Sequence, residues 1–525
     1  MNENKSIPSA ELEALLKRKA FTLDESRPEA VKKRHQKGKR TARENITDLC
    51  DKDTFIEYGS LIIAAQRSRR SKEDLIKNTP TDGLITGIGA INGDKFDDEV
   101  AKCMVLSYDY TVLAGTQGIM GHKKTDRMLH MADKLKLPIL FYVEGGGGRP
   151  GDTDFQGVGG LDVMTFYLWP KLSGKVPRIA IVGGYCFAGN AALAGCADVI
   201  IATKQASLGM GGPAMIEGGG LGVFHPKEVG PAATQFKNGV IDILVENEEE
   251  ATATAKKYLS YFQGKTKEWT CADQSQLRQI MPENRRFAYD VRKVITLLAD
   301  TDSVLEIRSG YGQAILTSFV RVEGNPLGVL ASNPKSMGGA IDSTSADKAA
   351  RFLQLCSAFN IPVLSLCDTP GIMVGPREEA TGTVRHASRL FMAGAHLKVP
   401  IFMIVTRRAY GLGSMAMAGG SFHVPFFTIS WPTGEFGGMG IEGAVRLGYR
   451  KELEAIADEK EREVAFNKMV EEAYEHGKAI NTASYLEIDE VIDPMESRKC
   501  IMNGILSNPL KSWKKNESQQ FIDAW

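Results

Sequence analysis

Apolar and polar positions alternate along the chain in two patterns, one typical of buried strands and one typical of helices. Short runs rich in β-branched residues predict strands that are covered on both faces. Between them, amphipathic stretches such as 122–135 and 345–359 carry apolar residues three and four positions apart, as on one face of a helix. The predicted strands include PILFYV (138–143), RIAIVG (178–183), PVLSL (362–366) and IFMIV (401–405). This alternation predicts an α/β fold with right-handed strand–helix–strand crossovers.

The same pattern occurs twice in the chain. LKLPILFYVEGGGG (135–148) aligns with FNIPVLSLCDTPGI (359–372), which places Pro138 opposite Pro362 at an offset of 362 − 138 = 224. Further on, 176–190 aligns with 399–413 at an offset of 400 − 177 = 223. A register that holds this long indicates an internal duplication. We therefore expect two duplicated α/β domains, 1–275 and 276–525, with the polar stretch 262–285 as the linker.

Composition narrows the classes of function. The 525 residues include 64 Lys+Arg and 64 Asp+Glu, so the formal net charge is zero and neither nucleic acid nor membrane is an expected partner. The eight cysteines form no CxxC pair, and no metal site is expected. The N-terminus lacks the pattern of a secretory signal, and no apolar run approaches about 20 residues. A cytoplasmic protein is expected.

One basic segment stands out from this balance. VKKRHQKGKRTAR (31–43) holds seven Lys/Arg, which would suit an arm that binds nucleic acid or the phosphates of CoA. The alternative is a solvated helix face. We favour the helix face, because the acidic runs at 11–13 and 51–53 compensate the charge.

Glycine marks the candidate chemistry. The 54 glycines cluster, and several clusters directly follow a predicted strand. Glycine at such a place permits positive φ, close backbone approach to a ligand, or free amides that face an anion. None of the clusters is a GxxxxGK[ST] phosphate loop, so ATP hydrolysis is not expected, and the chain has no Met-Lys-Met biotinylation signature.

Two of these loops occupy equivalent places in the two halves. The loops that end at Gly189 and Leu412 are followed by the small-residue stretches NAALAGC and SMAMAGG. A helix beginning there would direct unpaired amides at a nearby oxyanion. A tight strand–helix junction without a ligand is the alternative. Recurrence in both halves supports two oxyanion sites, which suits a reaction in which carbonyls of two substrates acquire charge.

A set of longer motifs identifies a family. In order along the chain they are RHQKGKRTARENITDLCDKDTFIE (34–57), DYTVLAGTQGIM (109–120), VEGNPLGVLASNP (322–334), TRRAYGLGSMAM (406–417) and WPTGEFGGMGIEGAVR (431–446). They resemble the carboxyltransferase family of biotin-dependent acyl-CoA carboxylases, which includes the propionyl-CoA carboxylase β subunit. EGGGGRPGDTD (144–154) and GMGGPAMIEGGGLGVF (209–224) look most like the carboxyltransferase region of single-chain, multidomain members.

The resemblance carries expectations about fold, substrates and assembly. Each half should be a crotonase-like domain, with acyl-CoA mainly on the N-terminal domain and carboxybiotin on the C-terminal one. Active sites lie between the N-domain of one subunit and the C-domain of another, so a homodimer or a ring of three dimers is expected. Biotin would arrive on a separate carrier protein or domain, and the other partners would be a biotin carboxylase and that biotin carboxyl carrier.

The resemblance also assigns residues on the acyl-CoA side. The amides of Gly189 and Asn190 are expected to hold the enolate oxygen of the thioester, with Gly146 and Gly147 as candidates for a further donor. Many members have Gly-Gly where this chain has Gly189-Asn190. A backbone amide survives that change, although the added side chain reshapes the pocket.

On the biotin side, the amides of Leu412 and Gly413 are expected to face the ureido oxygen, with Gly371 as a further candidate. Many members have Gly-Ala at the first two positions. Short-chain members commonly place Asp where this chain has Met415. A flexible apolar side chain suits a different or larger acyl group, unless Met415 is a core residue beneath the loop.

Two cations follow glycine-rich loops. Lys124 and Arg149 are candidates for contact with the phosphates of CoA, and solvation at the surface is the alternative. The histidines show neither HxxH nor HExxH spacing.

The sequence therefore predicts transfer of a carboxyl group from carboxybiotin to the α-carbon of an acyl-CoA, through an enolate held by backbone amides. A biotin-dependent acyl-CoA decarboxylase runs similar half-reactions in the other direction and stays an alternative. A non-catalytic scaffold or RNA-binding relative is a third possibility, which the intact glycine loops disfavour.

Overall fold

The computed structural model describes residues 9–154, 159–509, 511–516 and 519–525. The chain forms two compact units, Met1–Gln263 with Ala524 and Gly264–Asp523 with Trp525. The division falls at 263/264 and not at 275/276, because the polar stretch that follows packs into the second unit. There Leu277 belongs to the core, and Cys271 forms an antiparallel bridge with Asp300.

The N-terminal unit is built on a seven-stranded mixed sheet. β1, β2 and β3 pair antiparallel, and the remaining strands pair parallel. All residues of β4 and β5 are buried, as their apolar runs predict. In spatial order the strands are β1 (Ile56–Tyr58), β2 (Leu84–Ala90), β3 (Lys102–Tyr108), β4 (Ile139–Tyr142), β5 (Arg178–Val182), β7 (Val199–Thr203) and β9 (Ile243–Val245), and β6 (Tyr185–Phe187) pairs separately with β8 (Ser207–Gly209).

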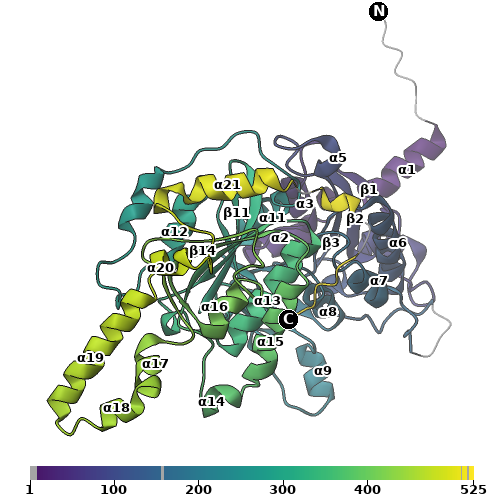
Figure 1. Cartoon of the computed structure of the whole chain (residues 1–525). Coiled ribbons are helices and arrows are strands. Elements are labelled where there is room, and N and C mark those ends of the chain that lie inside the picture. The colour runs from purple at the N-terminus through teal and green to yellow at the C-terminus, as the bar shows by residue number, and fades with distance from the viewer. Residues whose placement is uncertain (1–8, 155–158, 510, 517–518) are drawn as a thin grey trace, which may run out of the picture. The chain divides into compact units, whose positions relative to one another are not determined.

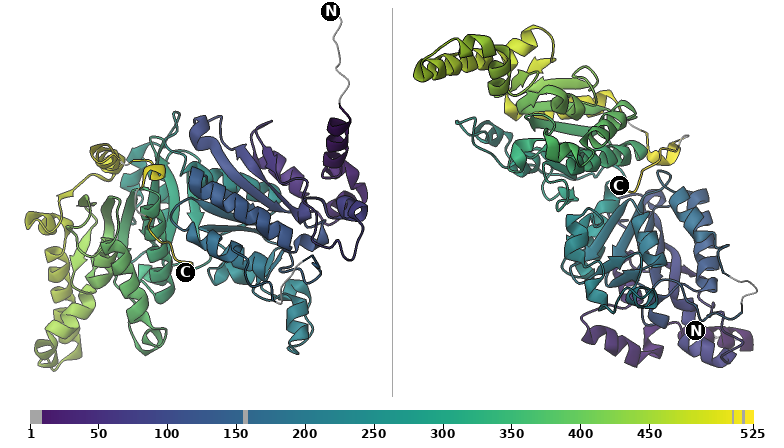
Figure 2. Two further views of the ribbon diagram at one scale, coloured as in Figure 1. Left: turned by 90° about the vertical axis from the view of Figure 1, so that its right-hand side faces the viewer. Right: turned by 90° about the horizontal axis from the view of Figure 1, so that it is seen from below.

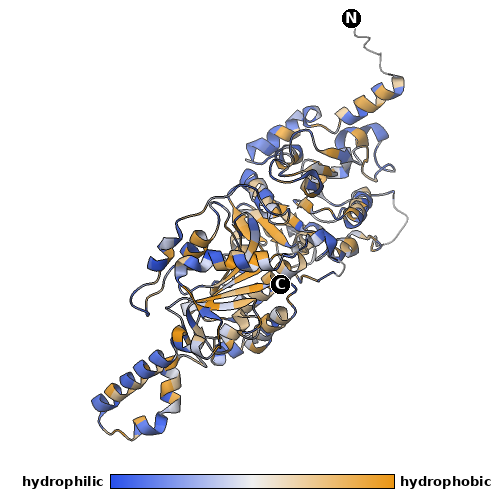
Figure 3. Cartoon of the chain, turned by 45° about the horizontal axis from the view of Figure 1, so that its top comes forward, coloured by the Kyte–Doolittle hydropathy of each residue, from blue (hydrophilic) through white to orange (hydrophobic). Residues whose placement is uncertain are grey.

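The sheet of the C-terminal unit repeats this order. Its first three strands are again antiparallel and the following ones parallel. Figure 3 shows the strands of this sheet as the most hydrophobic part of the unit. In spatial order they are β10 (Leu305–Ile307), β11 (Ile315–Val322), β12 (Asn325–Ser332), β13 (Val363–Thr369), β14 (Ile401–Tyr410), β15 (Phe427–Ser430) and β17 (Glu490–Val491), with β16 (Glu435–Gly437) paired to the end of β14.

Helices pack on the sheet of each unit (Figures 1 and 2). The predicted helices 122–135 and 345–359 are confirmed as α6 and α13. In the N-terminal unit the helices are α1 (Ala10–Ala20), α2 (Pro28–Gln36), α3 (Ala42–Leu49), α4 (Lys72–Asn78), α5 (Asp98–Ala101), α6 (Ile119–Leu135), α7 (Thr165–Lys171), α8 (Gly189–Gly195), α9 (Pro213–Gly218), α10 (Ala232–Lys237) and α11 (Glu248–Ser260). In the C-terminal unit they are α12 (Val291–Leu298), α13 (Ser343–Ala358), α14 (Pro376–Glu379), α15 (Thr383–Ala395), α16 (Gly411–Met417), α17 (Ile441–Gly448), α18 (Arg450–Glu454), α19 (Glu459–His476), α20 (Ala479–Ser484) and α21 (Ser497–Ser507).

The duplication extends to unusual backbone conformations. Leu113 and Met337, which are 337 − 113 = 224 residues apart, both adopt positive φ, at 49° and 48°. Lys136 and Asn360 form a second pair at the same offset, with φ of 49° and 55°. Non-glycine residues seldom adopt positive φ, so its recurrence at matching positions confirms two copies of one fold.

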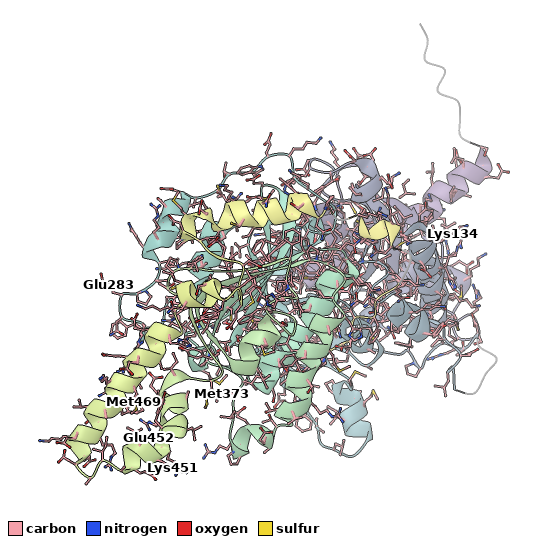
Figure 4. The ribbon with its side chains drawn as sticks, viewed as in Figure 1. Lys134, Glu283, Met373, Lys451, Glu452 and Met469 are labelled. Atoms are coloured by element: carbon pink, nitrogen blue, oxygen red, sulfur yellow. The ribbon has the colours of Figure 1, made fainter. Side chains whose placement is uncertain are left out.

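Helices α17, α18 and α19 project from the C-terminal unit (Figure 1). Figure 4 labels Met469, Lys451 and Glu452 on this projection. At its base, Val445 and Val470 form a small apolar cluster with Tyr410, the last residue of β14. The projection is thus anchored next to the glycine loop that follows β14. Among the helices of the described ranges, none is both long enough and apolar enough to span a bilayer.

Candidate active site

The two predicted oxyanion loops have matching geometry. Ala188 precedes α8 with a φ of 51°, and Gly411 begins α16 with a φ of 55°, at an offset of 411 − 188 = 223. Each turn leads from the end of a strand into the first turn of a helix. The first amides of a helix have no acceptor within it, and neither helix has a side-chain cap. The amides of Gly189 and Asn190 in one unit, and of Leu412 and Gly413 in the other, therefore occupy equivalent, uncapped positions.

In the N-terminal unit, the side chain of Asn190 supports this loop from beneath. It is fully buried, its Oδ1 accepts a hydrogen bond from the Gly147 amide at 2.9 Å, and its Nδ2 donates to the Gly115 carbonyl at 3.4 Å. The Gly146 amide donates to the Ala114 carbonyl at 3.2 Å. Both amides offered as a further donor are thus already engaged within the protein, which corrects that expectation.

The C-terminal unit replaces this side-chain support with direct backbone contact. A Cβ atom on Gly413 would lie 2.6 Å from the carbonyl carbon of Gly371, so in this chain a side chain at position 413 would require the Gly371 backbone to move. Gly371 itself has a φ of 128°, donates its amide to Thr369 Oγ1 at 3.2 Å and accepts from the Ile341 amide at 3.0 Å. Its place is therefore to support the Gly413 backbone. The loop continues through Met373, which Figure 4 labels.

Met415 lies beside these amides at a cavity of about 570 Å³ within the C-terminal unit. It is 38% exposed, so the interpretation of Met415 as a core residue is wrong. Leu412 is 61% exposed. The lining combines apolar and polar side chains, including Phe422, His423, Phe436, His476, Asn481 and Tyr485.

The structure does not support a role for Lys124 or Arg149 at the phosphates of CoA, nor does it leave them solvated. Lys124 is 3% exposed, donates to the Leu84 carbonyl, and has its pKa lowered to about 8 by burial. Arg149 binds Asp82 at 2.5 Å and Asp152 at 3.2 Å with a nearly buried side chain. Sequence proximity to a glycine loop was misleading, because both side chains turn into the unit.

The basic segment 31–43 is neither a free arm nor a uniformly solvated helix face. Arg34 is 9% exposed and forms a two-bond pair with Glu144, at 2.9 and 2.8 Å. Lys39 donates to the Gly183 carbonyl, and burial lowers its pKa. Two of the seven cations thus belong to the interior of the N-terminal unit. The sequence analysis did not predict these buried cations. The available signal was that Glu144 and Asp368 occupy equivalent positions in the two repeats, because a buried acid at such a position needs a cationic partner.

Ionisable groups outside the loops offer no metal centre within the described ranges, where no three His, Cys, Asp or Glu side chains gather closely enough. His122 lies near the N-terminal loop, with its ring 5.7 Å from that of Phe166. Its Nδ1 pairs with Thr165 Oγ1 at 2.9 Å, and burial lowers its pKa, so it is neutral at pH 7. The distinguishing chemistry of the site is therefore its set of backbone amides.

Two duplicated α/β units, each with a glycine loop at the start of a small-residue helix, define the class of protein to which this chain is compared. Residues 33–518 match the carboxyl transferase domain model, and the chain belongs to this family, the carboxyltransferases of biotin-dependent acyl-CoA carboxylases, built from two crotonase-like domains. Across 491 residues, 90% of both chains, it is 33% identical to the methylmalonyl-CoA carboxyltransferase 12S subunit of Propionibacterium freudenreichii subsp. shermanii.

Two solved structures are similar over almost the whole chain. A single-chain, multi-domain long-chain acyl-CoA carboxylase matches with a TM-score of 0.90 and 54% identity over 95% of this chain. This chain spans about half of that protein, 49% of its length. The transcarboxylase 12S hexamer with methylmalonyl-CoA bound matches with a TM-score of 0.83 and 29% identity, over 99% of this chain and 100% of that one.

Proposed function

We propose that this protein transfers a carboxyl group from carboxybiotin to the α-carbon of an acyl-CoA thioester. The observation that carries the proposal is the pair of uncapped amide sets, Gly189 with Asn190 and Leu412 with Gly413, at equivalent positions of two homologous units. A reaction in which two carbonyl oxygens gain charge requires two such sets. Membership of the carboxyl transferase family supplies the reaction class.

On the acyl-CoA side, the amides of Gly189 and Asn190 bind the thioester oxygen. The α-proton of a thioester is weakly acidic because charge accumulates on that oxygen as the enolate forms. Fixed donors that already point at the oxygen lower the barrier, and each is typically worth about 10²–10³ in rate. Asn190 holds the loop in place through its buried side chain, so the donors need no rearrangement during the reaction.

On the biotin side, the residues present fit a ureido ring. The amides of Leu412 and Gly413 supply two donors, and the neighbouring cavity of about 570 Å³ combines apolar and polar walls. The amides of Leu412 and Gly413 would hold the ureido oxygen of a biotin bound there, and carboxybiotin would supply both the carboxyl group and the base for the α-proton. The chain itself orients the ring and stabilises charge on the ureido oxygen. A general base from the protein is not required on this proposal.

The acyl group of the substrate is proposed to be long. The chain is 54% identical to a long-chain acyl-CoA carboxylase over 95% of its length, and Met415 presents a flexible apolar surface at the cavity. Phe166 adds apolar surface at the other site, because its ring tip lies 3.1 Å from where a Cβ on Gly189 would be. Each methylene buried against such surfaces contributes about 0.8 kcal/mol.

The working assembly is proposed to be a homodimer or a ring of three dimers, served by a biotin carboxylase and a biotin carboxyl carrier. The support is the hexameric assembly named for the transcarboxylase 12S relative. The RNA-binding alternative is weakened, since two of the seven cations of the basic segment, Arg34 and Lys39, make contacts inside the N-terminal unit.

The direct test is transfer of a carboxyl group from a malonyl-type CoA ester to free biotin or biocytin by the purified chain. We expect carboxybiotin and the decarboxylated acyl-CoA to form together without ATP or added metal. Activity that required ATP, or that vanished with EDTA and returned with a metal, would refute the proposal. Substrates of increasing chain length in the same assay test the long-chain assignment. Release of CO₂ without biotin would contradict a biotin-dependent transfer in either direction.

A further inference from the structure

Each unit carries one buried carboxylate at the same place, directly before its supporting glycine loop. Glu144 follows β4 and precedes Gly145, and Asp368 lies near the end of β13, at an offset of 368 − 144 = 224. The main chain at both positions is packed tightly. A Cβ on Gly115 would lie 2.5 Å from the Glu144 carbonyl oxygen, and one on Gly339 would collide with the Asp368 carbonyl oxygen. These carboxylates therefore sit where the strand end is joined to its neighbouring loop.

In the C-terminal unit, arginines of the adjacent strand bind this carboxylate. Arg407 donates to Asp368 Oδ2 at 3.1 and 2.8 Å, and Arg408 donates to Oδ1 from its Nε at 2.7 Å. Arg408 also donates to the Gly338 carbonyl at 2.7 Å. Both arginines lie on β14, four to six residues before Leu412 and Gly413. The Asp368 pairs thus fix the strand that delivers the biotin-side amides.

In the N-terminal unit, the equivalent position lies between β5 and β6 and holds no arginine. Gly184 corresponds to Arg407, since 407 − 184 = 223, and a Cβ at Gly184 would collide with Glu144 Oε1. The guanidinium comes instead from α2: Arg34 binds both oxygens of Glu144, at 2.9 and 2.8 Å. Its Nε donates to the Arg40 carbonyl at 3.1 Å, which ties it to the rest of the basic segment.

We propose that Arg34 is the positioning residue of the acyl-CoA side, supplied by the N-terminal segment in place of the strand arginines that perform this task on the biotin side. The pair with Glu144 holds the start of the loop from which Gly147 reaches Asn190 at 2.9 Å. The Gly145 amide links the same loop to the Tyr185 carbonyl at 2.8 Å, on the strand that leads to Gly189. Arg34 thereby acts on the Gly189 and Asn190 amides without touching the substrate. This inference rests on the proposed function.

The test compares Arg34→Met with Arg43→Met in the full-length protein. Arg43 lies in the same segment and also forms a two-bond pair, with Glu57 at 3.2 and 3.3 Å, but that pair has no contact with the glycine loops. We expect Arg34→Met to lower kcat for carboxyl transfer about 100-fold, the size of effect that a displacement of about 1 Å can cause, with a smaller change in KM. Arg43→Met should stay within about threefold of the original kcat.

A second measurement does not depend on turnover. Hydrogen exchange followed by mass spectrometry should show faster exchange in peptides covering 145–149 and 187–193 of Arg34→Met, and unchanged exchange in 409–416. If wild type lacks carboxyl transfer but this exchange pattern appears, the proposed function fails while the positioning role stands. If the folded variant shows neither faster exchange nor a lower kcat, Arg34 has no positioning role. Equal losses of kcat in Arg34→Met and Arg43→Met would also overturn the positioning role of Arg34.

The duplication provides its own rescue. The triple variant Arg34→Met, Glu144→Asp, Gly184→Arg copies the Arg407–Asp368 pair into the N-terminal unit. Gly184 does not adopt positive φ, and the shorter acid withdraws the Glu144 oxygen that a Cβ at position 184 would meet. Recovery of at least tenfold in kcat over Arg34→Met supports the proposal. If the folded triple variant shows no recovery and exchange in 145–149 stays fast, an arginine on the strand side cannot replace Arg34. That result would overturn the proposed equivalence of the Arg34–Glu144 and Arg407–Asp368 pairs.

Discussion

Replacement of Leu412 by proline removes a single backbone donor with little other change. Leu412 is the second residue of α16, where an amide has no acceptor inside the helix and proline is tolerated. Its side chain is 61% exposed, so the substitution costs little packing. The loss of one oxyanion donor predicts a fall of about 10²–10³ in kcat, equivalent to about 2.7–4 kcal/mol of transition-state stabilisation. Leu412→Ala keeps the amide and should retain most of the activity.

The assay is biotin-dependent carboxyl transfer from a malonyl-type CoA ester, with circular dichroism and the thermal midpoint as controls for folding. Both variants should bind the CoA ester with nearly the original affinity, because the amides proposed to hold its thioester oxygen lie in the other unit. Equal loss of kcat in Leu412→Pro and Leu412→Ala would assign the effect to the side chain. Full activity in Leu412→Pro would refute the amide as a donor.

Three further predictions concern Met415, Lys348 and the assembly of the protein. Met415→Asp should shift preference toward shorter acyl-CoAs by roughly fourfold in kcat/KM per methylene, from about 0.8 kcal/mol each; competition between short and long esters measures this, and an unchanged ratio removes Met415 from the specificity site. Burial lowers the pKa of Lys348 to about 7, so between pH 7 and about 10 the unfolded chain binds more protons and stability rises with pH, by up to about 1.4 kcal/mol per pH unit. In Lys348→Met, the free energy of unfolding measured with denaturant should rise less with pH, and the part of the rise due to Lys124 should remain. An unaltered pH profile would contradict the lowered pKa of Lys348. Light scattering should show a dimer or larger, and a fully active monomer would exclude the proposed assembly.

Local sequence was sufficient for much of the fold. Strands such as β4 and β14 follow from continuous apolar runs, and α6 and α13 from their periodicity, because burial on both faces or on one stripe imposes these patterns directly. The duplication was visible because equivalent turns demand equivalent residues. Gly115 and Gly339 recur at 339 − 115 = 224, and each has positive φ against a neighbouring carbonyl.

Side-chain direction was beyond the reach of the sequence. Lys124 and Arg149 stand beside glycine loops in the chain, yet the fold turns both inward to Leu84 and Asp82. The amides of Gly146 and Gly147 are candidates for a further donor by sequence, but the Ala114 carbonyl and the Asn190 side chain accept from them. Which backbone donors remain free depends on acceptors distant in sequence, so no local pattern reports it.

The sequence by itself determined the two-fold architecture, the strands, the positions of the glycine loops and the family. Only the tertiary structure decided that Glu144 pairs with Arg34, which lies 110 residues earlier in the chain, whereas Asp368 pairs with Arg407 on the neighbouring strand. Repeated segments fold alike because their local apolar patterns are alike. A buried charge, in contrast, must be neutralised by whatever partner the surrounding fold brings within hydrogen-bonding distance, and that partner can come from any part of the chain.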